Sequence, residues 1–133
     1  MTGSDKAMTA VTSAELPAAA GPYSQAVRAG GLLFTSGLLP LRAGSDELVG
    51  GADTVAQAGQ VLANLERLLA AAGTSMARVV KVTVYLVDLK DFQAVNALYA
   101  THFTAPFPAR SCVQVAALPK NARIELDAVA VLE

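Results

Sequence analysis

The sequence predicts an α+β fold with the element order ββαβαββ, in which two helices lie on one face of a mixed sheet. Two amphipathic helical patterns are separated and flanked by short runs rich in β-branched residues. The chain has 133 residues, 53% of them hydrophobic, which is enough for one packed domain and some apolar surface for a partner subunit. We expect residues 1–12 to form a flexible tail and residues 13–133 to form the domain.

The first two strands are predicted from turn signals. Gly21-Pro22 marks a turn, and Gly30-Gly31 separates two short strand-like runs at residues 24–28 and 32–36. These runs are expected to pair as a hairpin.

The first helix is expected to begin at Thr54, after a polar, glycine-rich stretch at residues 42–51. Thr54 and Gln57 have the spacing of a capping box, and Gly73 suits the left-handed position that ends a helix. The apolar stripe that should face the core consists of Val55, Ala58, Leu62, Leu65, Leu69 and Ala72.

A strand at residues 79–87 follows, with Val80, Val82, Val84 and Leu86 on one side and Lys81, Thr83 and Tyr85 on the other. Asp91 is then expected to cap a second helix, and the helical pattern breaks at residues 104–108. The apolar stripe of this helix consists of Phe92, Val95, Leu98 and Tyr99.

The last two strands, at residues 109–117 and 123–132, are separated by a turn at residues 118–121. In the first of these strands, alternation places Arg110, Cys112 and Gln114 on one face and Val113 and Val115 on the other. In the second strand it separates an apolar row (Ile124, Leu126, Ala128, Ala130) from a mixed row (Arg123, Glu125, Asp127, Val129, Val131). We expect the helices to cover the apolar rows. The mixed face, with Cys112, suits a subunit interface that holds a polar pocket.

Composition excludes several classes of function. The formal charge of −1 provides no basic field for nucleic acid, and the single Cys112 and single His102 make a metal site unexpected. The sequence contains no GxGxxG, GxxxxGK or GxSxG motif. It also has no apolar run long enough for a secretory signal or a membrane span, so we expect a cytoplasmic protein without membrane contact.

Arg110 is the main candidate for chemistry, because it starts a strand directly after a proline-containing loop. A guanidinium matches a carboxylate geometrically and would anchor a small anionic substrate; the alternative is an ion pair with Glu125 or Asp127. Glu125 could activate a water molecule or be a solvated strand residue. Tyr23 could line a pocket or pack, and Cys112 fits a buried thiol better than a nucleophile.

These residues belong to a larger set of motifs, and with them the sequence resembles the RidA/YjgF family of enamine/imine deaminases. The similarity extends from Pro17 to Val131. Its motifs are Gly21-Pro22-Tyr23-Ser24-Gln25-Ala26, Phe34-Thr35-Ser36-Gly37, the helix at 57–73, Val80-Lys81-Val82-Thr83-Val84, Val95-Asn96, Pro108-Ala109-Arg110-Ser111-Cys112-Val113, Leu118-Pro119-Lys120 and Ile124-Glu125.

The resemblance implies a chorismate-mutase-like fold and a homotrimer with its sites at subunit interfaces. It implies that Arg110 binds the carboxylate of a 2-imino or enamine acid such as 2-aminoacrylate, and that Glu125 and the backbone carbonyl of Cys112 place the water. Tyr23, Asn96 and the Ser36-Gly37 backbone would complete the substrate site. The products would be a 2-keto acid and ammonia, and no cofactor is implied.

Two positions depart from the family pattern: Leu38 replaces a usual glutamine and Gln114 a usual acidic residue. Both leave the substrate preference open. A non-enzymatic module that binds small carboxylates, and an RNA-cleaving or translation-inhibiting activity assigned to relatives, are the alternative functions.

Overall fold

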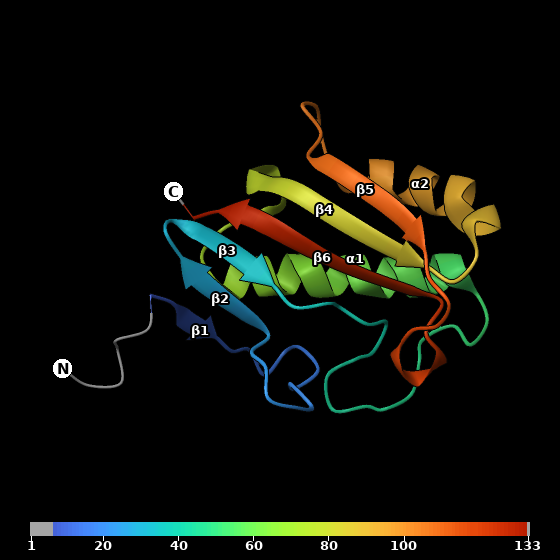
Figure 1. Ribbon diagram of the computed structural model, residues 1–133, viewed down its shortest axis with the longest axis horizontal. Coiled ribbons are helices and arrows are strands. Elements are labelled where there is room, and N and C mark those ends of the chain that lie inside the picture. The colour runs from blue at the N-terminus through green and yellow to red at the C-terminus, as the bar shows by residue number, and fades with distance from the viewer. Residues whose placement is uncertain (1–6, 133) are drawn as a thin grey trace.

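The computed structural model describes residues 7–132 and contains one six-stranded sheet with two helices on one of its faces (Figure 1). The predicted mixed α+β fold is therefore confirmed. The strands are β1 (Thr9–Val11), β2 (Ala26–Ala29), β3 (Leu32–Thr35), β4 (Val79–Leu86), β5 (Ala109–Gln114) and β6 (Ile124–Val131); the helices are α1 (Thr54–Ala71) and α2 (Phe92–Ala100). Short 3-10 turns lie at η2 (Met76–Arg78), η3 (Leu89–Asp91) and η4 (Pro119–Asn121).

The strand order is β1-β2-β3-β6-β4-β5, with β6 near the centre of the sheet. Only β4 and β5 pair in parallel, because α2 connects them as a crossover, and all other neighbours are antiparallel. The predicted hairpin of β2 and β3 is confirmed, and its turn is formed by Gly30 and Gly31 at positive φ.

The prediction of a flexible tail is wrong for its last part. Thr9–Val11 forms β1, which pairs with Ala26–Ala29 of β2, and Val11 is buried in the core. Residues 1–6 of that expected tail lie outside the described residues. Three residues with a single buried side chain give too weak a sequence pattern for a strand, since pairing with β2 supplies most of the order.

The start of α1 differs from the predicted capping box. Asp53 is the N-cap, and its carboxylate accepts hydrogen bonds from the backbone N–H groups of Val55 and Ala56. Gln57 is fully buried and spans two other segments: it donates to the carbonyl of Gly51 and accepts from the backbone N–H of Arg123. Gln57 therefore ties α1 to the start of β6.

The core lies between the sheet and the two helices, and it contains most of the predicted apolar stripes. Two residues predicted to face the core, Val55 and Val80, are exposed instead. Val55 is 37% exposed on α1, and the fully buried Val61 and Leu68 were absent from the predicted stripe. Val80 is also exposed, because an irregularity in the β4–β6 pairing between Val79 and Lys81 turns its side chain out of the core.

The prediction that Cys112 belongs to the mixed face is also wrong. In the parallel register, Arg110 pairs with Val82 and Cys112 with Val84, so both side chains lie on the helix-covered face. Val113 lies beside Tyr85 on the opposite face, where it is 42% exposed. Alternation within a strand cannot show which of its rows joins the core; the pairing with β4 decides this.

The face without helices, hereafter the open face, carries the mixed row of β6 together with apolar side chains from neighbouring strands. Tyr85 pairs with Glu125 and Thr83 with Asp127, and the Tyr85 hydroxyl donates to the Asp127 carboxylate at 2.9 Å. This hydrogen bond and the negative charge of Asp127 raise the pKa of Tyr85. Phe34 is 40% exposed on β3, beside Val129.

Candidate functional site

Arg110 is held on the helix-covered face by three side chains of α2. Its Nη1 donates to Asn96 Oδ1 at 2.7 Å, and its guanidinium carbon lies 5.4 Å from the Phe92 ring centroid and 4.7 Å from that of Tyr99. Phe92, Asn96 and Tyr99 follow the i, i+4, i+7 spacing of one helix face. Together they fix the guanidinium between an amide oxygen and two aromatic rings, an arrangement hereafter called the arginine cradle.

The charge of Arg110 has no carboxylate partner in the described part of the chain. Ion pairs at residues 7–132 include Lys90 with Asp88, Lys120 with Asp46 and Arg123 with Asp91, and none involves Arg110. The alternative that Arg110 pairs with Glu125 or Asp127 is therefore wrong, and the guanidinium keeps donors for a ligand.

Glu125 lies on the open face against the backbone of Gly37. A side chain at position 37 would displace the Glu125 carboxylate from its present position, so glycine here leaves room for that carboxylate. The approach is fixed by backbone hydrogen bonds in both directions between Leu38 and Leu126. Burial, and secondarily the charge of Asp127, raises the pKa of Glu125 above its ordinary value, which suits a carboxylate that must accept a proton.

Ser36 and Tyr23 lie close to Gly37. The Ser36 hydroxyl donates to the carbonyl of Ser24 at 2.5 Å, and the Ser36 N–H donates to the carbonyl of Gln25, so the turn before Gly37 is tied to the end of the 16–25 loop. Tyr23 is 54% exposed, and its hydroxyl accepts from the backbone N–H of Ala20. The tyrosine ring therefore lies at the surface and is not a packing residue of the core.

Cys112 is half-buried two residues after Arg110 and packs against the core. Burial raises the pKa of its thiol, and the nearby Arg110 charge only partly opposes this effect. The thiol is thus mostly protonated near neutral pH, which fits the expectation that it does not act as a nucleophile.

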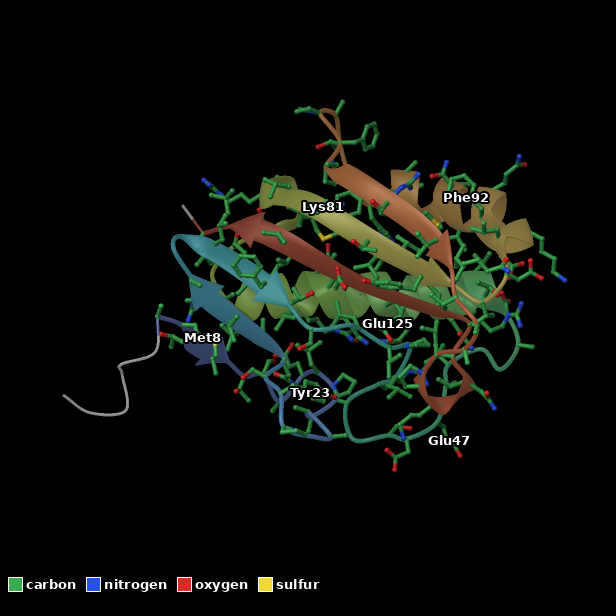
Figure 2. All side chains as sticks on the ribbon, viewed as in Figure 1. Met8, Tyr23, Glu47, Lys81, Phe92 and Glu125 are labelled. Carbon is green, nitrogen blue, oxygen red and sulfur yellow. The ribbon has the colours of Figure 1, made fainter. Side chains whose placement is uncertain are left out.

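The predicted site residues form two groups that do not meet within one chain. Arg110, Asn96 and Cys112 lie between β5 and α2, whereas Tyr23, Ser36, Gly37 and Glu125 lie around the end of β3 and the open face. In Figure 2, Phe92 of the arginine cradle is well separated from Tyr23 and Glu125. A reaction that uses both an arginine and a glutamate of these groups therefore needs one of the two side chains to come from another molecule.

Sequence reasoning treated Phe92 and Tyr99 only as core residues and missed their contact with Arg110. Their spacing with Asn96 was the available signal, because three residues on one helix face can surround one side chain from a neighbouring strand. At the two departures from the family pattern, the Leu38 side chain is buried in the hydrophobic core, and the Gln114 side chain accepts a hydrogen bond from the backbone N–H of Leu89.

Within the described residues, no group of three His, Cys, Asp or Glu side chains is close enough together to hold a metal ion. Neither of the two α-helices there has both the length and the apolar character needed to cross a membrane.

A guanidinium with free donors on one face of the sheet and a half-buried carboxylate on the other are the polar groups of the candidate site in this α+β protein. The chain belongs to the RidA/YjgF family: the sequence model of that family, described as "Endoribonuclease L-PSP", matches residues 13–132.

Named relatives match most of the chain. The chain is 48% identical over 118 residues to the 2-iminobutanoate/2-iminopropanoate deaminase of Escherichia coli K12, covering 86% of this chain and 91% of the relative. It is 48% identical to protein DfrA of Myxococcus xanthus, covering 94% and 96%. The crystal structure of E. coli TdcF with bound serine superposes with a TM-score of 0.85 at 39% identity, covering 92% and 98%. Relatives with deaminase names support an enzymatic activity in general.

Proposed function

We propose that this chain hydrolyses 2-imino acids and their enamine tautomers, such as 2-aminoacrylate, to 2-keto acids and ammonia without a cofactor. The observation that carries the proposal is the arginine cradle: a guanidinium fixed by Asn96 and two rings, with no carboxylate partner among residues 7–132. Such a group binds a substrate carboxylate in one orientation. The deaminase names of relatives at 48% identity support the same reaction.

Glu125 supplies the second requirement, a base near the reacting carbon. Its pKa is raised by burial, so the carboxylate can take a proton from water as the oxygen adds to the imine carbon. The nitrogen takes up a proton, the C–N bond of the resulting carbinolamine breaks, and ammonia leaves as the keto group forms. The reaction consumes one water per imine, and the Cys112 carbonyl would help to hold that water.

The site is completed between copies of the chain in a homotrimer. Arg110 and Glu125 lie on opposite faces of one sheet, so a pocket that contains both takes Arg110 from one copy and Glu125 from the next. The apolar side chains on the open face, Phe34 and Val113 among them, support packing against another copy. Tyr23, Ser36 and Gly37 would lie on the Glu125 side of the shared pocket, and Asn96 on the Arg110 side.

The direct test is hydrolysis of imines made in situ by an amino-acid oxidase, followed as ammonia release beyond the spontaneous rate. Arg110→Ala should lower kcat/KM at least about 100-fold, because a charge-assisted bidentate contact is lost, while light scattering still reports a trimer. Arg67→Ala, at an exposed arginine on α1, is the matched control and should keep full activity. Unchanged turnover in Arg110→Ala would contradict the assignment.

A second candidate is a non-enzymatic module that binds small carboxylates. The serine bound to TdcF favours it, because that structure contains a ligand with a carboxylate. Calorimetric binding of serine or a 2-keto acid that depends on Arg110, without acceleration of the hydrolysis of any imine, would support this module in place of the enzyme.

The RNA-cleaving activity in the family description would require RNA cleavage that persists through purification and is lost in Arg110→Ala.

A further inference from the structure

A cavity of about 330 Å³ adjoins the Glu125 side of the proposed site. Tyr23, Ser36 and Gly37 form part of its wall, and other residues of the 16–25 loop, the 38–46 segment, Asn64 of α1 and Lys120 form the rest. Figure 2 shows Tyr23 in the loop region below the sheet, where this cavity lies. Its volume is at the lower end of the range for small-molecule pockets, roughly 300 to 1,000 Å³.

The walls of the cavity are mostly apolar. Four leucines line it, namely Leu16, Leu38, Leu39 and Leu41. Three consecutive alanines, Ala18, Ala19 and Ala20, also line it and leave the space open because their side chains are short. Leu38 is the position at which the family pattern has a polar residue. The leucine there adds apolar surface directly after Gly37.

Two polar side chains in the wall, Asn64 and Gln25, form several hydrogen bonds within the protein. Asn64 donates both amide hydrogens, to the carbonyls of Leu39 and Leu41, and accepts from Gln60. Gln25 donates to the carbonyls of Ser13 and Pro17 and accepts from the N–H of Ser13. Lys120 and Asp46 also line the cavity and pair with each other at 3.5 Å, but the Asp46 side chain is 95% exposed, so this pair lies at the solvent-exposed edge. Away from that edge, the cavity offers mainly apolar surface, which favours a hydrocarbon group.

We propose that this cavity receives the side chain of the substrate, so that the chain prefers 2-imino acids with branched or aromatic apolar side chains over 2-iminopropanoate. This preference rests on the proposed imine hydrolysis. A methyl group would leave most of the space empty or hydrated, whereas a leucine or phenylalanine side chain would displace that water. In an apolar pocket, each additional methylene of a substrate raises kcat/KM by about tenfold or more. We therefore expect kcat/KM for the leucine-derived imine to exceed that for the alanine-derived imine at least about tenfold.

The test uses imines generated in situ by an oxidase from alanine, leucine and phenylalanine, with the same protein concentration throughout. Ala19→Phe should fill the cavity from an exposed loop, and it should lower the leucine-to-alanine ratio of kcat/KM at least about tenfold. Ala14→Phe adds the same ring at an exposed position outside the cavity wall and should leave that ratio unchanged.

Equal kcat/KM values for the three imines in the unmodified protein would overturn the preference and leave imine hydrolysis standing. An unchanged ratio in Ala19→Phe would also overturn it. Loss of the assembled state in Ala19→Phe by light scattering would show that the cavity receives a partner subunit and no substrate. Absence of acceleration for every imine would instead overturn the proposed hydrolysis itself, and the preference with it.

Discussion

The chemistry of Arg110 depends on its neighbours, because a flexible guanidinium binds a carboxylate in a defined orientation only when its own position is fixed. Asn96 supplies a hydrogen bond at 2.7 Å, and Tyr99 supplies an aromatic face at 4.7 Å. Tyr99 is 5% exposed, and its hydroxyl has no hydrogen-bond partner in the part of the chain that the structure describes. The ring of Tyr99, and not its hydroxyl, is therefore the part that positions Arg110.

We predict that Tyr99→Leu raises KM for imino acids about tenfold or more and lowers kcat less, since a desolvated cation–π contact is worth on the order of 2 kcal/mol. Tyr99→Phe keeps the ring and should behave like the unmodified protein. Thermal unfolding of both variants separates a loss of stability from a loss of positioning. If Tyr99→Phe and Tyr99→Leu show the same rise in KM, the ring does not position the guanidinium.

At this scale the sequence was informative about which residues matter but not about how they are arranged. Arg110 could be singled out by its residue type and by the loop before it, and Gly37 by its motif. The contact of Tyr99 with Arg110, and the close approach of Glu125 to Gly37, depend on tertiary packing between segments far apart in the chain. No local pattern contains that information.

The carboxylate of Asp91 joins three segments of the chain. Asp91 Oδ2 accepts from the Thr54 hydroxyl at 2.8 Å and from Arg123 Nη2 at 3.1 Å, which ties the start of α1 and the start of α2 to the segment before β6. The hydrogen bond from Thr54, assisted by Arg123, holds the pKa of Asp91 below its usual range. Asp91 is the N-cap residue of α2, as the sequence predicted, but its side chain makes no capping hydrogen bond.

Asp91→Asn should lower the free energy of unfolding at pH 7 by roughly 1–3 kcal/mol, because charge-assisted hydrogen bonds are lost at a partly buried site. Since the folded-state pKa is lowered, this stabilisation is present above the unfolded pKa and is lost as pH falls through the folded one. The difference between the two proteins in thermal unfolding should therefore shrink below about pH 4. Asp46→Asn, at a 95% exposed carboxylate, is the control; a pH-independent difference for Asp91→Asn would contradict the account.

Helices and strands were predictable to within a few residues because periodicity is local. The φ of 84° at Gly73 confirms the predicted end of α1. The face that Arg110 and Cys112 occupy was not predictable, because it follows from the parallel register of β5 against β4. That pairing is made by residues about 30 apart in the chain. The strand at Thr9–Val11 was missed for a similar reason, since it is defined by its partner β2.

For the whole molecule, the separation of the two residue groups is the main constraint. The sheet itself lies between Arg110 on the helix-covered face and Glu125 on the open face, so no side-chain rearrangement within one copy brings them together. The open face also carries Phe34 and Val113, whose side chains are 40% and 42% exposed and could be covered by another copy of the chain. An assembly that covers this face would account for both features.

Complementation between two inactive variants tests whether each site takes Arg110 and Glu125 from different copies of the chain. Arg110→Ala and Glu125→Gln should each be inactive alone, because every site lacks either the anchor or the base. When equal amounts are dissociated and reassembled together, about a quarter of the shared sites combine an intact Arg110 with an intact Glu125, so about a quarter of the activity should return. No recovery, with mixed assemblies verified by mass spectrometry, would contradict a site shared between copies.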